Sequence, residues 1–316
     1  VQDASFLKNE IMRLKKEKDV VILAHNYEIP DVQDVADFTG DSLGLSKLAA
    51  TVQQKTILFC GVHFMAETAA IISPEKRVLL PSLEAGCSLS DSITADELRN
   101  WKKQHPDAIS VGYVNTTAEI KSELDYCCTS SNAVNVVNSI PKDKEILFLP
   151  DMFLGSYVAK MTGRNNMHIW AGECHVHAGI TPEDVTKKLN SMHDTEFLIH
   201  PECSCTTPMM YDVADGSYEN NKVSILSTEG MLNYASASKS KNFVVATETG
   251  ILYKMKKDNP DKTFVPASEK AECQYMKMIT LEKVHDALVR EKNVITVPKK
   301  IADKARLAIN RMLEIS

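Results

Sequence analysis

The stretch CSLSDSITADEL (87–98) has two counterparts farther along the chain, CHVHAGITPEDV (174–185) and CQYMKMITLEKV (273–284). In each stretch, Ile and Thr stand six and seven residues after the cysteine, an acidic residue nine after it, and Leu or Val eleven after it. The chain is therefore a threefold internal repeat with one cysteine in each copy. If the copies close around a pseudo-threefold axis, the three thiolates meet at its centre. There they could hold one metal centre and leave a coordination position open, which indicates catalysis rather than structural support.

The segments upstream of these cysteines also repeat in the same order. Each copy has an apolar stretch that ends in polar side chains, followed by two further apolar stretches. The first stretches are VVILAHNYE (20–28), AISVGYVNT (108–116) and EFLIHPEC (196–203), the second are 56–62, 145–151 and 242–248, and the third are 77–81, 167–170 and 263–266. Apolar strands that alternate with helical patterns predict parallel sheets covered on both faces. We expect an α/β fold of three pseudo-symmetric αβα repeats around a pseudo-threefold axis, with the active site at the centre.

The copies divide the chain into repeats at residues 1–106, 107–194 and 195–316, the last with a C-terminal helix. Cys87 and Cys174 are 87 residues apart, whereas Cys174 and Cys273 are 99 residues apart. The third repeat therefore carries about twelve extra residues, the difference between 99 and 87. We expect this insertion in the polar stretch 215–224, because polar residues there separate segments that lie closer together in the other copies.

Composition excludes several classes of partner. The net charge of -6 and the isoelectric point near 5.9 leave no basic surface for a phosphate backbone, so no nucleic-acid partner is expected. No run of about 18 apolar residues occurs, and residues 1–19 have the pattern of a charged helix rather than a signal peptide. We expect a cytoplasmic protein without a membrane partner. Its eight cysteines are then ligands, reactive thiols or core residues rather than disulfides. The absence of GxGxxG and Walker patterns argues against a nucleotide cofactor.

Polar side chains stand where each first strand ends, at the edge of a parallel sheet where ligands bind. These residues are His25 and Tyr27, Tyr113 and Asn115, and His200 and Glu202. Hydroxyl residues follow at positions typical of helix N-caps, namely Ser42, Ser130 and Thr228. On a threefold axis, three such helix N-termini would converge and form an anion site from N–H groups and helix dipoles. A small, multiply anionic substrate is the expected ligand.

Recurrence in register favours Cys87, Cys174 and Cys273 as metal ligands. Zinc usually takes a fourth protein ligand or a catalytic water, whereas an iron–sulfur cluster accepts three separated thiolates and leaves one iron free. His175 flanks a cysteine loop and is favoured as a residue behind the ligands. The remaining cysteines lack counterparts in the other copies, and we interpret them as core or peripheral thiols: Cys60, Cys127, Cys128, Cys203 and Cys205.

Several longer strings resemble the quinolinate synthase family. They include AHNYEIPDVQDVADFTGDSLGLS (24–46), GVHFMAETA (61–69), LLPSLEAGCSLSD (79–91), YVNTTAEIKSELDYCCTSSNAV (113–134), LPDMFLGSYVA (149–159), WAGECHVH (170–177), HPEC (200–203) and MKMITLEKV (276–284). The resemblance extends from about Val20 to Leu288. It implies a transferase of de novo NAD biosynthesis that depends on a 4Fe-4S cluster. Such an enzyme condenses iminoaspartate with dihydroxyacetone phosphate to quinolinate, releases phosphate and water, and is linked functionally to the enzyme that supplies iminoaspartate.

The resemblance also implies roles for individual residues. Cys87, Cys174 and Cys273 would hold the cluster, and its open iron would act as a Lewis acid on substrate oxygens. Proton transfer would involve Tyr27, Tyr113, His200 and Glu202. Substrate binding would involve His25, Ser42, Tyr113, Val114, Asn115, Ser130, His200, Pro201, Glu202 and Thr228. The assignment of Thr228 competes with Ser217, because the insertion separates Ala214-Asp215 from Ser227-Thr228.

Two other classes of protein remain open at this point. A metal-dependent hydrolase would bind zinc through His175, His177, His200 and Glu202. An iron–sulfur redox sensor would also hold a cluster. That function does not explain why His, Tyr, Asn and Glu side chains would surround the cluster.

Overall fold

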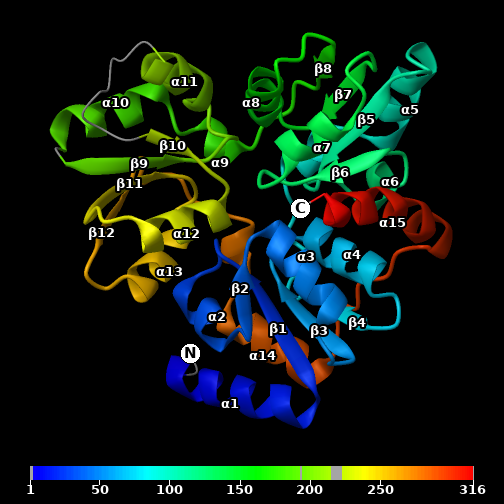
Figure 1. Cartoon of the computed structure of the whole chain (residues 1–316). Helices are drawn as coiled ribbons and strands as arrows, with labels where there is room; N and C mark the ends of the chain where they lie inside the picture. The colour runs from blue at the N-terminus through cyan, green and yellow to red at the C-terminus, as the bar shows by residue number, and fades with distance from the viewer. Residues whose placement is uncertain (1–2, 193, 215–222, 316) are drawn as a thin grey trace.

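The computed structural model describes residues 3–192, 194–214 and 223–315. These residues form three four-stranded sheets in which all paired strands are parallel, with helices against the sheets (Figure 1). The strand orders are β2-β1-β3-β4, β6-β5-β7-β8 and β10-β9-β11-β12, so each repeat has the same topology. The predicted α/β fold of three αβα repeats is confirmed.

The helices and strands have the following bounds. The first part of the chain forms α1 (Ala4–Glu17), β1 (Val20–His25), α2 (Pro30–Val35), β2 (Phe38–Gly40), α3 (Ser42–Thr51), β3 (Thr56–Cys60), α4 (His63–Ile72), β4 (Arg77–Leu79), the 3-10 turn Ser90–Ser92 and α5 (Ala95–Gln104). The middle part forms β5 (Ile109–Tyr113), α6 (Ala118–Lys121), β6 (Tyr126–Cys128), α7 (Ala133–Ser139), β7 (Ile146–Leu149), α8 (Met152–Thr162), β8 (Met167–Ile169), α9 (His175–Ala178) and α10 (Pro182–Ser191). The last part forms β9 (Thr195–Ile199), α11 (Thr206–Ala214), β10 (Val223–Ile225), α12 (Thr228–Ala237), β11 (Asn242–Ala246), α13 (Ile251–Asp258), β12 (Thr263–Pro266), the 3-10 turn Met276–Met278, α14 (Leu281–Arg290) and α15 (Lys299–Glu314).

Nine of these strands correspond to the apolar stretches of the sequence, and three do not. The three missed strands are β2, β6 and β10, which have three residues each and lie at one edge of each sheet. A run of three residues is too short for the hydrophobic pattern to distinguish a strand from a loop. By contrast, every residue of β1 and β3 is buried, as expected for strands that are covered on both faces.

The repeated Thr after each cysteine begins a helix. Thr94 and Thr181 form capping boxes with the acidic residue three positions later, and Thr280 accepts a hydrogen bond from the backbone of Lys283. The apolar residue eleven positions after each cysteine is fully buried in all three copies, at Leu98, Val185 and Val284. The motif that identified the repeat is thus a helix start followed by a core residue.

The helix that follows each cysteine packs on the next sheet of the molecule. Arg99 of α5 pairs with Glu119 and Glu123 beside β5, and α10 shares a core with Phe197 of β9. The third such helix, α14, returns to the first sheet, where it shares a core with α1 and Ile22 of β1 (Figure 1). The three repeats are therefore linked in a closed ring, and their boundaries at 106/107 and 194/195 stay a prediction.

Two segments that the sequence interpretation assigned to the third repeat need a separate description. The C-terminal helix, grouped with the third repeat, is α15, and it packs against β6, α6 and α4 (Figure 1). Most of the predicted insertion, residues 215–222, lies outside the described residues. Val223 and Ser224, the last two residues assigned to the insertion, pair with β9 as part of β10. Because β10 has counterparts in the other repeats, β2 and β6, assigning these two residues to the insertion was wrong.

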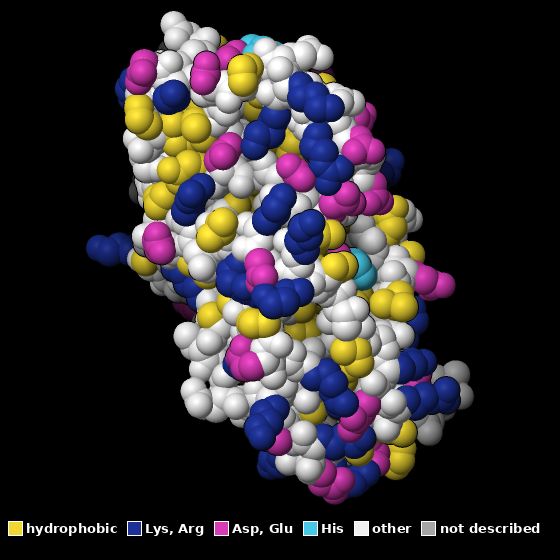
Figure 2. All heavy atoms as spheres, turned by 90° about the vertical axis from the view of Figure 1, so that its right-hand side faces the viewer, with side chains coloured by type: hydrophobic (Ala, Val, Ile, Leu, Met, Phe, Trp, Pro, Cys, Tyr) yellow, Lys and Arg dark blue, Asp and Glu magenta, His cyan; other side chains and the backbone are white. Residues whose placement is uncertain are grey.

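The surface and the helix lengths add two observations. On the face shown in Figure 2, basic and acidic side chains are intermingled rather than gathered into a field of one sign. Among the described residues, none of the helices has both the length and the apolar character that crossing a bilayer demands.

Candidate active site

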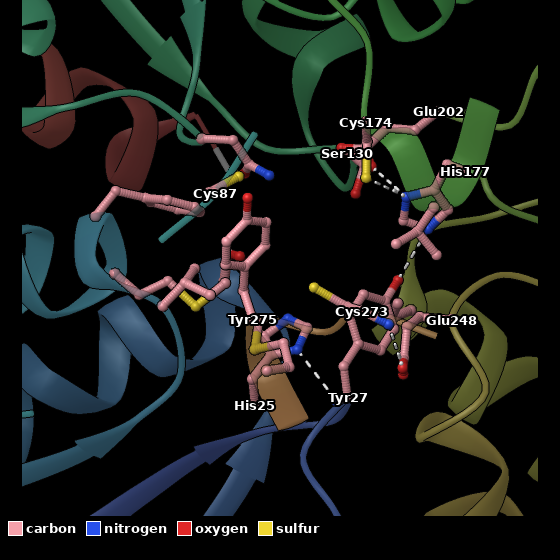
Figure 3. Close-up of a pocket in the computed structure, with 18 of the residues that line it drawn as sticks. His25, Tyr27, Cys87, Ser130, Cys174, His177, Glu202, Glu248, Cys273 and Tyr275 are labelled. Carbon is pink, nitrogen blue, oxygen red and sulfur yellow. Dashed lines mark hydrogen bonds and ion pairs between the residues drawn. The ribbon is translucent and has the colours of Figure 1, made fainter. Parts of the chain in front are cut away.

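A cavity lies where the carboxyl ends of strands from all three sheets meet (Figure 3). Twelve of the predicted site residues line it: His25, Tyr27, Ser42, Cys87, Tyr113, Asn115, Ser130, Cys174, His200, Glu202, Thr228 and Cys273. Val114 and Pro201 are buried beside it, and the backbone N–H of Val114 donates to the carbonyl of Cys128 at 2.8 Å. Ser217 lies outside the described residues. The parallel topology thus brings equivalent strand ends together, as the repeat predicts.

The three repeated cysteines lie on three sides of this cavity, and their side chains are directed toward it (Figure 3). All three are free thiols and partly buried. Burial is the largest effect on each, and it raises the pKa of Cys87 to about 12 and the pKa values of Cys174 and Cys273 above the usual thiol range. Among the described residues, the three sulfurs do not all lie within 4.8 Å of one another. The three sulfurs therefore surround the cavity instead of converging on a single position.

His177 connects the cysteine loop to the strand ends. Its Nδ1 lies 2.8 Å from Glu202 Oε2 and 3.3 Å from Cys174 Sγ, while its Nε2 lies 2.8 Å from Thr247 Oγ1 and 3.3 Å from the hydroxyl of Tyr27. A carboxylate only accepts hydrogen bonds, so Nδ1 carries a hydrogen. In a neutral ring, Nε2 then accepts from a hydroxyl. The sequence interpretation considered His177 only for the zinc alternative, although its place beside Cys174 was visible.

Two strand-end histidines adopt the same local structure in the first and third repeats. The backbone N–H of Tyr27 donates to Nδ1 of His25 at 3.2 Å, and that of Glu202 donates to Nδ1 of His200 at 3.4 Å. Because Nδ1 accepts, the neutral ring carries its hydrogen on Nε2. Burial is the main reason why the pKa of each histidine falls to about 3. Both rings are therefore neutral N–H donors at physiological pH.

Acidic and phenolic groups of the cavity are also strongly perturbed. Burial alone would raise the pKa of Glu202, but the nearby imidazoles, above all the contact with His177, outweigh it and hold the value at about 2. Its other oxygen, Oε1, is buried without a hydrogen bond of normal geometry, although the Tyr113 hydroxyl lies close enough to the carboxylate to lower its pKa. The side-chain oxygen of Asn115 is likewise buried without a hydrogen bond. Burial raises the pKa values of Tyr27 and Tyr113 well above the usual range. The cavity thus contains an ionised carboxylate, two protonated phenols and buried oxygens that can accept a hydrogen bond from a ligand.

The three hydroxyl residues are not N-caps, contrary to the prediction for Ser42, Ser130 and Thr228. Asp41 caps α3 by accepting from the backbone of Gly44 at 2.8 Å, and Ser227 caps α12 in the same way at 3.2 Å. In the second repeat, α7 begins after Asn132, two residues beyond Ser130. The preceding Asp or Ser is better placed to cap because the N-cap position comes before the first helical residue.

This correction leaves the hydroxyls directed to the cavity. Ser42 and Thr228 are the first residues of α3 and α12, and Ser130 lies in the loop before α7. All three line the cavity, and none of the lining residues in the described chain is Lys or Arg. Hydroxyls, helix N-termini and neutral imidazoles are thus the donors offered to an anion.

An ion pair at the wall of the cavity was missed from the sequence. Glu248 is fully buried and lies 2.8 Å from Lys277 Nζ, and its carboxylate accepts from the backbone N–H groups of Cys273 and Gly250. Lys277 also donates to the carbonyl of Tyr27. Burial raises the pKa of Glu248, with Lys277 opposing. Thr247 and Glu248 follow β11 directly, so the strand-end rule that selected His25 could have found them.

The other thiols and His175 lie behind or beside the cavity. The five remaining cysteines are fully buried and free: Cys60, Cys127, Cys128, Cys203 and Cys205. Cys127 and Cys128 belong to β6, and Cys203 and Cys205 belong to the core under β9, so a packing role fits all of them. His175 lines the cavity, and its Nδ1 lies 2.7 Å from Ser88 Oγ next to Cys87.

Comparison with known proteins identifies the family of this chain. The family model described as quinolinate synthetase A protein matches residues 9–314. The chain belongs to the quinolinate synthase family. It is 52% identical over 309 residues to a quinolinate synthase of Thermus thermophilus, an alignment that covers 98% of this chain and 97% of the relative. It is 50% identical over 306 residues to a quinolinate synthase of Mycobacterium tuberculosis, with 97% of this chain and 88% of the relative covered. The sequence resemblance is thereby confirmed.

Proposed function

We propose that this chain is a quinolinate synthase that condenses iminoaspartate with dihydroxyacetone phosphate in de novo NAD biosynthesis. The observation that carries the proposal is the meeting of three repeated cysteines and three sets of strand-end donors at one cavity, in a chain of this family. Loss of one phosphate and two water molecules from the two substrates balances every atom of quinolinate. No oxidant or reductant is therefore needed, and the reaction requires only condensation, proton transfer and elimination.

A 4Fe-4S cluster fits the donor set of this cavity. A single tetrahedral ion with metal–sulfur bonds of ~2.3 Å would hold its thiolates ~3.8 Å apart. Because the three sulfurs exceed 4.8 Å in at least one pair, a cluster of several irons fits them better. Buried thiols also need a cationic centre to remain ionised. With Cys87, Cys174 and Cys273 as its ligands, the cluster would supply one iron with an open position, which polarises a substrate oxygen.

The strand ends would bind the substrate oxygens. His25 and His200 each present an Nε2–H donor, and Tyr113 presents its hydroxyl from the equivalent position of the second repeat. Neutral donors suit carboxylates and phosphate, since they add no charge of their own that must be desolvated. Hydroxyls at the starts of α3 and α12, with that of Ser130, would complete an anion site for the dicarboxylate or the phosphate.

Proton transfer would fall to Glu202, Tyr27 and Tyr113, with His200 as a further donor. The unpaired Oε1 of Glu202 can accept a hydrogen from an amine or hydroxyl of the substrate, while His177 holds Oε2 in place. Phenols with raised pKa values stay protonated and can donate to a developing negative oxygen. Closure of the cavity around the substrates would also protect unstable iminoaspartate from competing water. A reducing compartment such as the cytoplasm, near the enzyme that supplies iminoaspartate, forms part of the proposal.

One observation favours the zinc hydrolase as the second candidate. The Cys174 sulfur, a ring nitrogen of His177 and a carboxylate oxygen of Glu202 all lie within 4.8 Å of one another. This group differs from the four residues expected from the sequence, because His175 is engaged with Ser88. A zinc ion there would use one of three equivalent cysteines and leave Cys87 and Cys273 without a role.

Anaerobic metal analysis combined with product analysis separates these candidates. The purified chain is assayed for iron, sulfide and zinc, then incubated with dihydroxyacetone phosphate and with oxaloacetate plus ammonium as a source of iminoaspartate. We expect iron and sulfide for one cluster per chain, and quinolinate and phosphate in equal amounts. A colourless zinc protein would support the hydrolase. An intact cluster with no quinolinate would overturn the proposed reaction.

A further inference from the structure

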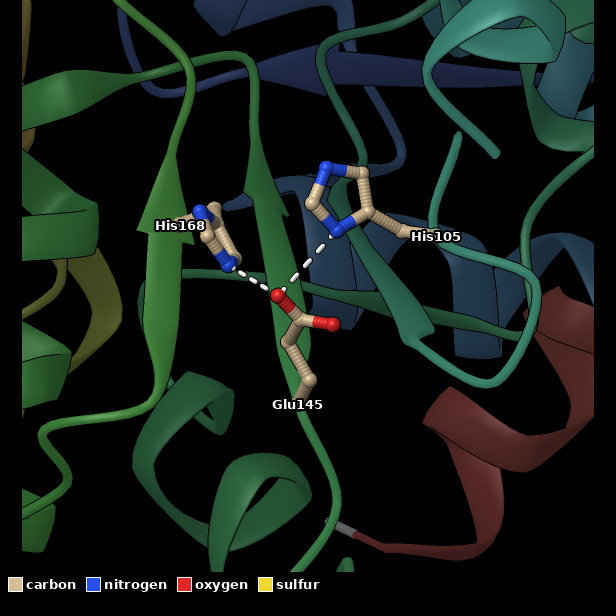
Figure 4. A group of neighbouring side chains, drawn as sticks. All are labelled: His105, Glu145 and His168. Carbon is tan, nitrogen blue, oxygen red and sulfur yellow. Dashed lines mark hydrogen bonds and ion pairs between the residues drawn. The ribbon is translucent and has the colours of Figure 1, made fainter. Parts of the chain in front are cut away.

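A second group of metal-ligating side chains lies at the opposite end of the middle sheet (Figure 4). Glu145 directly precedes β7, and His105 lies in the short connection between α5 and β5, so both lie near the amino ends of these strands, whereas the cavity lies at the carboxyl ends. His168 is the central residue of the edge strand β8. None of the three lines the cavity. The repeat did not reveal this group, because the other copies do not carry the same three residues at the corresponding positions.

The two imidazoles converge on a single carboxylate oxygen. Glu145 Oε1 lies 3.1 Å from Nδ1 of His105 and in closer contact with Nε2 of His168 (Figure 4). The three donor atoms all lie within 4.8 Å of one another. Between 29% and 45% of each side chain is exposed, so the group is open to solvent. Among the described residues, Glu145 forms ion pairs with these two histidines and with no Lys or Arg.

We propose that His105, Glu145 and His168 bind one divalent transition-metal ion such as Zn²⁺ or Ni²⁺. Two imidazole nitrogens and one carboxylate oxygen are a donor set that such ions prefer over Mg²⁺ or Ca²⁺, and water would complete the coordination. Bonds of ~2.1 Å in a tetrahedral site separate the donors by ~3.4 Å, close to the spacing of His105 and Glu145. The contact of His168 with Glu145 lengthens when the half-exposed carboxylate turns aside to admit the ion.

The position of His105 supports a cation at this place. His105 is the C-cap of α5, a helix of ten residues, and its ring stacks on Trp101 of the last turn at 4.0 Å between centroids. The C-terminal carbonyls of a helix favour positive charge. Stacking fixes the ring so that little rotamer freedom is lost on binding. The competing interpretation is a hydrogen-bonded triad, in which Glu145 accepts N–H bonds from both histidines and no metal binds.

Trp101 provides a direct readout that does not depend on activity. The chain has two tryptophans, and Trp170→Phe leaves Trp101 as the single indole. A paramagnetic ion bound to His105 quenches an indole that is stacked on this ligand. We expect Ni²⁺ to quench the fluorescence of the anaerobic, cluster-loaded Trp170→Phe protein in a saturable way, at one ion per chain. Cluster absorbance and quinolinate formation should stay unchanged.

Matched variants show which side chains bind the ion. Adding His168→Gln or Glu145→Gln should raise the half-saturating Ni²⁺ concentration at least tenfold. His63→Gln should have no effect, because the exposed His63 pairs with Glu67 at 3.8 Å without a second imidazole. The proposal would be overturned if His168→Gln and Glu145→Gln left the quenching as strong as in the Trp170→Phe parent. It would also be overturned if quenching followed the loss of cluster absorbance.

A comparison on the otherwise unaltered protein keeps the test decisive if a variant folds poorly. Excess Mg²⁺ should leave Ni²⁺ quenching unchanged, whereas Zn²⁺ should compete with it at a similar concentration. Competition by Mg²⁺ with the strength of Zn²⁺ would mean that imidazoles do not hold the ion, and the hydrogen-bonded triad would be the correct interpretation.

Discussion

Nδ1 of His177 lies 2.8 Å from Oε2 of Glu202, and both side chains are almost completely buried. The contact joins α9, which follows Cys174, to the turn after β9. It holds one carboxylate oxygen in place and leaves the other, Oε1, without a partner in the cavity. A fixed carboxylate with one free oxygen is the arrangement that a proton-transfer group requires.

Removing either member of this pair should lower turnover while the cluster remains bound. Glu202→Gln keeps the shape of the side chain but loses the charge and the basic oxygen, and we expect turnover to fall about 10²–10⁴-fold. His177→Gln removes the group that orients the carboxylate, together with the ring contacts to Thr247 and Tyr27, but leaves the carboxylate itself, so a loss of about 10–100-fold is expected. Steady-state assays with the absorbance spectrum of the cluster check both values. Near-normal turnover of Glu202→Gln would remove this residue from the mechanism.

Protein stability should fall as the pH drops from 7 toward 5, because His25 and His200 are buried as neutral rings. Their folded pKa values are about 3, whereas an unfolded histidine titrates near ~6.5. Between these values the unfolded chain binds more protons, so acid favours unfolding. Each ring contributes a slope of up to ~1.4 kcal/mol per pH unit in this window. Thermal melting from pH 7.5 to 6, where cluster absorbance confirms an intact protein, should show a flatter dependence in His200→Asn. An unchanged slope in this variant would contradict the prediction.

The architecture was predictable because its signal is repeated, and the missed parts are those that the repeat does not encode. Three cysteines in register, each followed by a helix-capping Thr, predict three equivalent units and the convergence of their strand ends. The contacts of His177 with Glu202 and of Lys277 with Glu248 could not be predicted, because each joins segments whose packing depends on the closed ring. The same limit explains the N-cap error. Asp41 and Ser42 are both good caps, and only the backbone conformation decides between them.

The Lys277–Glu248 pair should be important for stability. Lys277→Met leaves the fully buried carboxylate without its cation, and breaking such a pair typically costs about 3–5 kcal/mol. Adding Glu248→Gln to this variant removes the uncompensated charge, so the double variant should recover part of the loss. Thermal melting of both proteins in their cluster-loaded form measures the difference. A double variant that is less stable than Lys277→Met would show that the backbone bonds of Glu248, rather than its charge, dominate.

The cluster should depend on the three repeated cysteines and on no other thiol. Alanine at Cys87, Cys174 or Cys273 should abolish stable binding of iron and sulfide under anaerobic conditions, because two thiolates hold a cluster poorly. Cys127→Ala and Cys203→Ala are matched controls, since both thiols are buried in the core and should retain the cluster. Iron and sulfide analysis after anaerobic reconstitution gives the result. Full occupancy in Cys174→Ala would exclude this set of ligands.

The start of α12 offers a pair of adjacent hydroxyls that separates ligand binding from helix capping. Ser227 caps the helix through Gly230, whereas Thr228 is the first helical residue and lines the cavity. Ser227→Ala should therefore destabilise the protein by about 1 kcal/mol and leave ligand affinity nearly unchanged. Thr228→Val keeps the branched shape but removes a hydroxyl whose bond to a carboxylate or phosphate contributes about 1.5–3 kcal/mol. It should raise the dissociation constant of a dicarboxylate or phosphate ligand about tenfold to a hundredfold at little cost in melting temperature.

Titration calorimetry and thermal melting of both variants, with Ser217→Ala beside them, test the assignment. Weaker binding in Ser217→Ala with unaltered binding in Thr228→Val would move the third arm of the anion site to Ser217.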